Sequence, residues 1–169
     1  DSLENGAGYC SQFAHPTELE RLLHFVADPD GSFLRDLLAA HHADTCQTSC
    51  PDCLRDYANL AWHCILDWRL AVDMARLALD PNAPVDFTIP YWQPLVAAVT
   101  TPYFNALGWA VTTFGGLPAA RSGSGGELIV HPMWSNTHPA VGLARNEASA
   151  VGVTQLKTKT LFDLVRRPF

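Results

Sequence analysis

The sequence predicts an α+β protein in which a helical N-terminal half precedes a small mixed α/β half. Three observations support this fold class. Apolar residues recur every three or four positions through residues 17–79, which is the spacing of amphipathic helices. Short β-branched and aromatic runs separated by Gly and Pro follow from residue 85 onward. Three cysteines lie close together between predicted helices, and we expect the helical half to be built around a zinc-binding loop there.

Composition limits the classes of protein to which the chain can belong. Its 169 residues are 48% apolar, enough for an ordinary hydrophobic core, and no apolar run approaches a membrane span. A formal charge of −6 disfavours a free-standing domain that holds nucleic acid by bulk electrostatics. We expect a helical region 1–84 and a mixed α/β region 85–169 that packs on it as one domain. Because the chain opens at Asp1 without an initiator Met, we expect a C-terminal fragment of a larger polypeptide.

Three helices are predicted before residue 85. The first begins at Pro16, has a capping-box spacing between Thr17 and Glu20, and is broken at residues 29–31. The second has one apolar side that includes His41 and is formed by Phe33, Leu34, Leu37 and Leu38.

The third predicted helix, Leu54 to Leu79, is the longest, because this stretch contains no Pro or Gly. Its apolar stripe includes Tyr57, Ile65, Trp68, Val72 and Ala75, with Cys64 expected as a small core residue at the stripe's edge. The opposite side is expected to be a solvated polar face formed by Asp56, Asn59, His63 and Asp67.

Strands and helices mix in the second half. The pattern predicts strands at 85–89, 109–114 and 128–130, with a hairpin or flexible connection at 121–126. Helices are predicted over 90–105, interrupted at Pro102, and over 139–150; residues 161–165 fit a last strand or a short helix.

The cysteine cluster carries the clearest chemistry. Cys46, Cys50 and Cys53 have the spacing C-x3-C-x2-C, and a C-x2-C step places two thiolates on one turn. Zinc is the ion that best suits thiolate ligands in tetrahedral geometry. Disulfides, a redox pair and unliganded core thiols are the alternatives. The low and odd number of cysteines disfavours disulfides, and a third cysteine upstream is atypical of a redox motif.

A fourth ligand must come from elsewhere in the chain. Cys10 follows a Gly-rich turn and would complete an all-thiolate site, so we favour it. His42, four residues before Cys46, is the alternative, and it could instead be a cation that interacts with the C-terminal end of a helix. We expect His41 and Cys64 in the core rather than at the metal.

Other candidate sites have weaker support. The Gly6-Ala7-Gly8 turn lacks the Gly-Lys-Ser/Thr of a phosphate-binding loop, so it predicts a tight turn. His131 and His138 could serve a hydrolase or nuclease, but no carboxylate pattern at matching spacing accompanies them. We expect the tryptophans to pack in the core rather than stack on bases.

Several segments resemble a known family. The run SCPDCLRDYAN at 49–59, followed by LDWRLAVDMA at 66–75, resembles the MrfA-type zinc-binding C-terminal domain of bacterial DEAD/DEAH-box helicases. ENGAGYC at 4–10 and the later HPMW and FDLVRRP segments are also similar to that family. The resemblance implies a structural zinc held by four cysteines, three of which would be Cys46, Cys50 and Cys53. It also implies a cytoplasmic parent protein whose motor domains bind ATP and magnesium and translocate along DNA.

Three functions are therefore compared. The first, which we favour, is a structural zinc-binding domain of an ATP-dependent DNA helicase or translocase in DNA repair or phage defence. Its partners would be the motor domains of the same or an associated polypeptide, and DNA through the parent. The second is a protein-interaction adaptor in a multi-subunit defence complex. The third is a hydrolase or nuclease that uses the histidines. No catalytic motif in the sequence identifies the chain itself as an enzyme.

Overall fold

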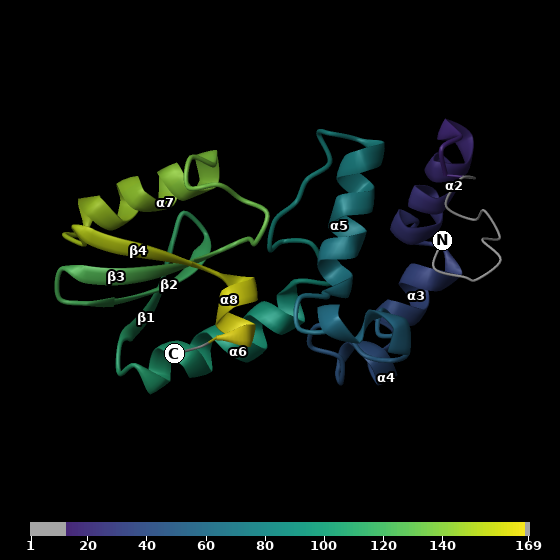
Figure 1. The fold of residues 1–169 in the computed structure, drawn as a ribbon. Helices are drawn as coiled ribbons and strands as arrows, with labels where there is room; N and C mark the ends of the chain where they lie inside the picture. The colour runs from purple at the N-terminus through teal and green to yellow at the C-terminus, as the bar shows by residue number, and fades with distance from the viewer. Residues whose placement is uncertain (1–12, 168–169) are drawn as a thin grey trace. The chain divides into compact units, whose positions relative to one another are not determined.

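A computed structural model describes residues 13–167 and shows an α+β fold (Figure 1). The chain divides into two compact units, residues 1–84 and 85–169. We call them the helical unit and the sheet unit and describe each by itself. The predicted fold class is confirmed, because helices and the cysteine cluster occupy the first half and a mixed four-stranded sheet with helices forms the second.

In the described residues 13–84, the helical unit has five short helices joined by turns and loops: α2 (Pro16–Ala27), α3 (Ser32–Leu38), α4 (Ala40–Ala43), the 3-10 helix η1 (Tyr57–Trp62) and α5 (Trp68–Leu79). Helix α2 packs against α5. Proline is well suited to the first turn of a helix, where its missing N–H would have no partner, so Pro16 sets the start of α2. The N-cap is therefore His15 and has no side-chain cap, so the predicted capping box at Thr17 and Glu20 is wrong.

The second predicted helix is broken in two. Ala39 has extended backbone angles (φ −61°, ψ 139°), and it separates α3 from α4. The break changes which histidine faces inward. His42 is buried and His41 is exposed. The expectation that His41 packs in the core is wrong, because it assumed that one helix continued through Ala39.

The long helix predicted over residues 54–79 is also wrong, since only its second half, α5, is a regular α-helix. The side chain of Asp67 accepts hydrogen bonds from the backbone N–H groups of Arg69 and Leu70, and this N-cap starts α5. Trp68, Val72 and Ala75 are buried as predicted. The part of the predicted apolar stripe that precedes this cap is not in α5, and Tyr57 and Ile65 of that part are exposed.

The sheet unit contains α6 (Gln93–Ala106), β1 (Ala110–Phe114), β2 (Leu117–Ser122), β3 (Gly125–Val130), α7 (Pro139–Ala150), β4 (Gln155–Thr160) and α8 (Leu161–Arg166). The sheet order is β1-β2-β3-β4; the first two pairings are antiparallel and β3–β4 is parallel. Gly115 and Gly116 both have positive φ (56° and 77°), as the two-residue turn between β1 and β2 requires. A parallel pair needs a crossover, which α7 supplies.

The core of the sheet unit lies between one sheet face and α7. Leu128, Ala144 and Ala148 are completely buried there, and Phe114, Val130, Val141 and Val153 pack around them. On the opposite face, the hydroxyl of Tyr103 in α6 donates to Glu127 Oε1 (2.8 Å) and accepts from Lys159 Nζ (3.3 Å). Burial, with help from Glu127, raises the pKa of Tyr103 to about 12. This half therefore has its own hydrophobic and polar packing.

Most predictions for the second half are confirmed. The helix at 139–150 has the predicted bounds, and the strand predicted at 109–114 is β1. The segment predicted at 128–130 is the end of β3, and residues 161–166 are the short helix α8. The strand predicted at 85–89 is wrong, because these residues form irregular turns, and β2 and β4 were not predicted.

His131 and His138 have structural roles in this half. The His131 side chain is fully buried among the rings of Phe87, Trp92 and Trp134. His138 caps α7 by accepting from Ala140 N, and its ring stacks on Trp134. Within residues 13–167, no helix combines the length and the apolar character that crossing a bilayer requires.

Candidate metal centre

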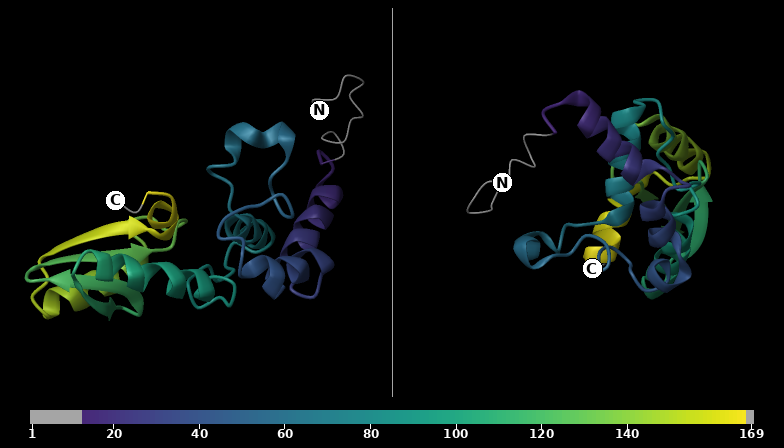
Figure 2. Two further views of the ribbon diagram at one scale, coloured as in Figure 1. Left: turned by 90° about the horizontal axis from the view of Figure 1, so that it is seen from below. Right: turned by 90° about the vertical axis from the view of Figure 1, so that its right-hand side faces the viewer.

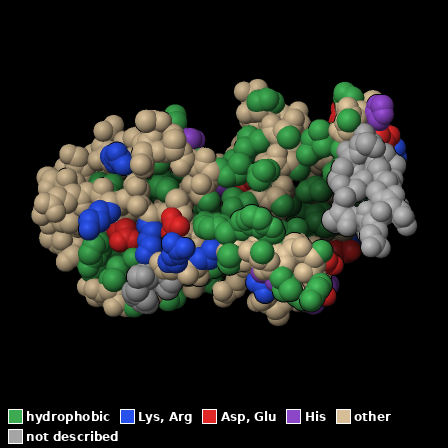
Figure 3. Space-filling view, in the orientation of Figure 1, with side chains coloured by type: hydrophobic (Ala, Val, Ile, Leu, Met, Phe, Trp, Pro, Cys, Tyr) green, Lys and Arg blue, Asp and Glu red, His purple; other side chains and the backbone are tan. Residues whose placement is uncertain are grey.

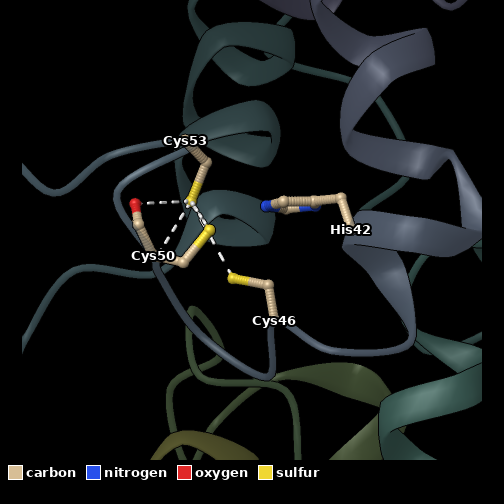
Figure 4. A group of neighbouring side chains, drawn as sticks. All are labelled: His42, Cys46, Cys50 and Cys53. Atoms are coloured by element: carbon tan, nitrogen blue, oxygen red, sulfur yellow. Dashed lines mark hydrogen bonds between the residues drawn. The ribbon is translucent and has the colours of Figure 1, made fainter.

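One His and three Cys side chains converge between α4 and the loop that follows it (Figure 4). They are His42, Cys46, Cys50 and Cys53, and their ligand atoms all lie within 4.8 Å of one another. Figure 4 shows the His42 ring pointing toward the three sulfur atoms. His42 and Cys46 are buried and the other two cysteines are partly buried, so the group lies at the edge of the helical unit's interior.

Backbone hydrogen bonds place the ligands. Cys46 N donates to His42 O (2.8 Å), which continues the turn of α4 and brings the first cysteine beside the histidine. The carbonyl of Cys50 accepts from the backbone N–H groups of Cys53, Leu54 and Arg55 at 3.0–3.2 Å. This tight turn brings two thiols together and lets Cys50 N donate to Cys53 Sγ (3.1 Å). The local sequence therefore builds most of the site without help from distant segments.

The first turn of α5 is hydrogen-bonded to the cysteine loop. Trp68 N donates to Thr48 O (2.9 Å), and Trp68 Nε1 donates to Cys46 O (3.4 Å). The Trp68 ring also meets the His42 ring edge to face at 5.7 Å. Trp68 therefore contacts both the cysteine loop and His42. Such contacts orient metal ligands.

The distances between sulfur atoms fit a tetrahedral ion. Cys53 Sγ lies 3.8 Å from Cys50 Sγ and 3.9 Å from Cys46 Sγ. A disulfide requires about 2.05 Å, so these pairs are not bonded to each other. A tetrahedron with zinc–sulfur bonds of about 2.3 Å has edges of about 3.8 Å. The donor set of three thiols and one imidazole is that of a structural zinc site.

The histidine is oriented for metal binding. Its Nδ1 lies 2.9 Å from the carbonyl oxygen of Leu37, so Nδ1 carries the hydrogen and donates it. This tautomer leaves a lone pair on Nε2. Nε2 is buried and has no hydrogen-bond partner among the described residues. Since buried polar atoms are almost always satisfied, an Nε2 that faces three sulfurs indicates a missing ligand, and an ion fits that position.

The protonation of the cysteines depends on such an ion. Burial, together with the neighbouring Cys53, raises the pKa of the Cys46 thiol above its usual range. Burial also raises the pKa of Cys53, although N–H groups of Cys50 and Leu54 act in the opposite direction. Both groups are therefore neutral thiols at pH 7 in the absence of a cation. A bound divalent cation stabilises the thiolates and releases their protons.

The structure brings together the three predicted cysteines and the alternative fourth ligand, His42. Cys10, the fourth ligand that the sequence favoured, lies outside the described residues. The separation of four residues between His42 and Cys46 was the signal that pointed to the histidine. Cys64 is exposed, so the prediction that it packs in the core is wrong.

Comparison of the chain with protein-family models, with curated proteins and with solved structures found no match. The site's geometry therefore supports a metal-binding domain without help from relatives.

Proposed function

We propose that this chain is a structural zinc-binding domain that supports the motor of an ATP-dependent DNA helicase or translocase. The orphaned, buried Nε2 of His42 opposite three clustered thiols carries the zinc part of the proposal. Four protein ligands complete a tetrahedron and leave no open position for substrate, which is typical of a structural rather than a catalytic zinc. The ion would fasten α4 to the cysteine loop, which is held in turn against α5.

The motor context is supported by the sequence resemblance alone. The resembling segments include two of the clustered cysteines and the first turns of α5, which are the parts that build and hold the metal site. ATP and magnesium would bind to the motor domains, since the chain contains no phosphate-binding motif. DNA repair and phage defence are the settings that we propose for such a protein.

Metal titration tests the zinc part of the proposal. We expect one zinc per chain by elemental analysis of protein purified under reducing conditions. Cobalt substitution should give the intense thiolate absorption bands of a tetrahedral site. Protein without bound metal after zinc reconstitution would contradict the proposal. In the polypeptide that carries this domain, Cys50→Ser should lower DNA-stimulated ATP hydrolysis, and a parent without that activity would refute the motor context.

A second function, the protein-interaction adaptor, is favoured by the segment between the metal loop and α5. We call residues 54–67 the arm; it contains η1 and projects from the helical unit (Figure 2). Four large apolar side chains of the arm are exposed: Tyr57 (88%), Leu60 (55%), Trp62 (60%) and Ile65 (51%). Hydrophobic side chains are visible on the surface of this unit in Figure 3.

The polar side chains of the arm bond to the arm itself. Asp56 and Asn59 form a capping box around the start of η1. Asn59 Nδ2 donates to Leu54 O (2.8 Å), and His63 Nε2 lies 2.7 Å from Asn59 Oδ1. Of the predicted solvated face, Asp56 is exposed, Asn59 and His63 are half-buried in this network, and Asp67 is buried as the N-cap of α5. The large apolar side chains of the arm are the exposed ones. Exposed aromatic residues on an ordered support are typical of protein-binding surfaces.

Replacing arm residues separates the adaptor function from a structural one. Because Tyr57 and Trp62 are exposed, changing both to Ser should alter the free energy of unfolding by no more than about 0.5 kcal/mol per site and leave the zinc content unchanged. Leu143→Ser, at an equally exposed Leu in α7, is the matched control. Light scattering after gel filtration with subunits encoded alongside the chain should show a complex that the double variant loses and the control keeps. A complex that the double variant retains would contradict the adaptor function.

A further inference from the structure

Charge balance at the candidate metal centre directs attention to Arg69. A divalent ion with three thiolates and a neutral imidazole has one net negative charge, and Asp67, two residues before Arg69, carries another that acts on Arg69. Uncompensated negative charge is costly in a partly buried site. Arg69 is 2% exposed and is the single buried Lys or Arg side chain among residues 13–167. Buried arginines are rare unless they are paired with negative charge, so the burial of Arg69 indicates negative charge near it.

The contacts of Arg69 place its guanidinium against the loop that carries the cysteine ligands. Its Nη1 donates to the carbonyl oxygen of Gln47 (2.8 Å), the residue that follows Cys46. Its guanidinium lies over the Trp68 ring, 4.2 Å from the ring centroid. That same ring contacts His42 and bonds to Cys46 O. Trp68 therefore contacts both the Arg69 guanidinium and two of the four ligand residues, His42 and Cys46.

The electrostatic environment agrees with this placement. Burial lowers the pKa of Arg69, whereas Asp67, and Cys46 and Cys53 in their ionised forms, act to raise it. A guanidinium nevertheless remains charged at any physiological pH. Its charge is thus permanent, and it is already in place when an ion binds and the thiols lose their protons.

We propose that Arg69 is the charge-compensating positioning residue of the metal centre, which strengthens zinc binding by offsetting the excess negative charge of the thiolates. The inference rests on the proposed zinc site. It assigns to the first turn of α5 an electrostatic role in metal affinity, in addition to its packing against the loop.

Two substitutions distinguish charge from hydrogen bonding. Arg69→Gln keeps a donor for the Gln47 carbonyl and removes the charge, whereas Arg69→Lys keeps the charge and loses the planar shape. Competition with a chelator of known affinity should show zinc binding weakened about 10–100-fold in Arg69→Gln, the range found for partners in the outer shell of metal sites. Arg69→Lys should restore most of that loss. The cobalt spectrum should stay tetrahedral in both variants, because no ligand changes.

The control is Arg76→Gln on the same helix, since Arg76 pairs with Asp73 and lies two turns further along α5; its zinc affinity should match that of the unaltered chain. Equal affinity in Arg69→Gln and the unaltered chain would overturn the inference. If zinc-saturated Arg69→Gln lacks helical circular dichroism, that variant is misfolded, and the zinc affinity of Arg69→Lys then tests the charge role. Near-native affinity there supports the charge role, and a loss of 10-fold or more refutes it. Absence of zinc from the unaltered chain would instead refute the proposed function itself.

Discussion

Removing zinc with a chelator is expected to unfold the helical unit cooperatively and to leave the sheet unit folded. The apolar core of the helical unit is small among the described residues: Leu34, Leu37, Cys46, Trp68, Val72 and Ala75. No residue of helix α2 is fully buried. Small cores of this kind usually need a metal or disulfides. Structural zinc supplies about 10–16 kcal/mol in zinc-finger peptides, which is as large as the whole net stability of a typical domain.

Amide hydrogen exchange measures this result directly. Chelation should remove protection from α5 and from the turn at Cys50–Arg55, while amides of β3 and α7 keep theirs because Leu128 and Ala144 belong to a separate core. Zinc, added back under reducing conditions, should restore the lost protection. Unchanged protection of α5 in fully chelated protein would show that the fold does not depend on the metal.

Replacing His42 is the second change with a large expected effect. His42→Ala removes a ligand and opens the site, so zinc affinity should fall by more than about 100-fold, beyond the range of outer-shell partners. His42→Cys should retain tight binding, because a thiolate can replace imidazole in a tetrahedral site. Chelator competition measures both affinities, and the contrast separates a ligand role from packing against Trp68.

Cys10→Ser is the matched control for the fourth ligand. If His42 completes the site, Cys10→Ser should bind zinc as tightly as the unaltered chain. The opposite pattern, with tight binding in His42→Ala and loss in Cys10→Ser, would make Cys10 the fourth ligand. Cobalt spectra give an independent readout, since the thiolate bands weaken only when a cysteine ligand is lost.

Sequence periodicity predicted some elements well and failed at others for identifiable reasons. The helix predicted at 139–150 is α7, and Pro139 occupies its first turn, where proline is favoured. The long helix at 54–79 was not formed, because Asp56 and Asp67 bond to backbone N–H groups and start new segments there. Apolar spacing cannot reveal such caps, since it counts side-chain hydrophobicity and ignores local hydrogen bonds. Strand β4 was missed because its sequence, QLKTKT, is largely polar and pairs at a sheet edge.

The sequence by itself determined the α+β class, the cysteine cluster and the type of ion that this cluster favours, because ligand spacing and apolar periodicity are local properties. The tertiary structure decided which histidine joins the thiols. The break at Ala39 buries His42, exposes His41, and lets the Leu37 carbonyl fix the His42 tautomer. It also placed Arg69 behind the ligand loop and the apolar residues of the arm at the surface. Those outcomes depend on where helices stop, which is set by backbone hydrogen bonds and not by hydrophobic pattern.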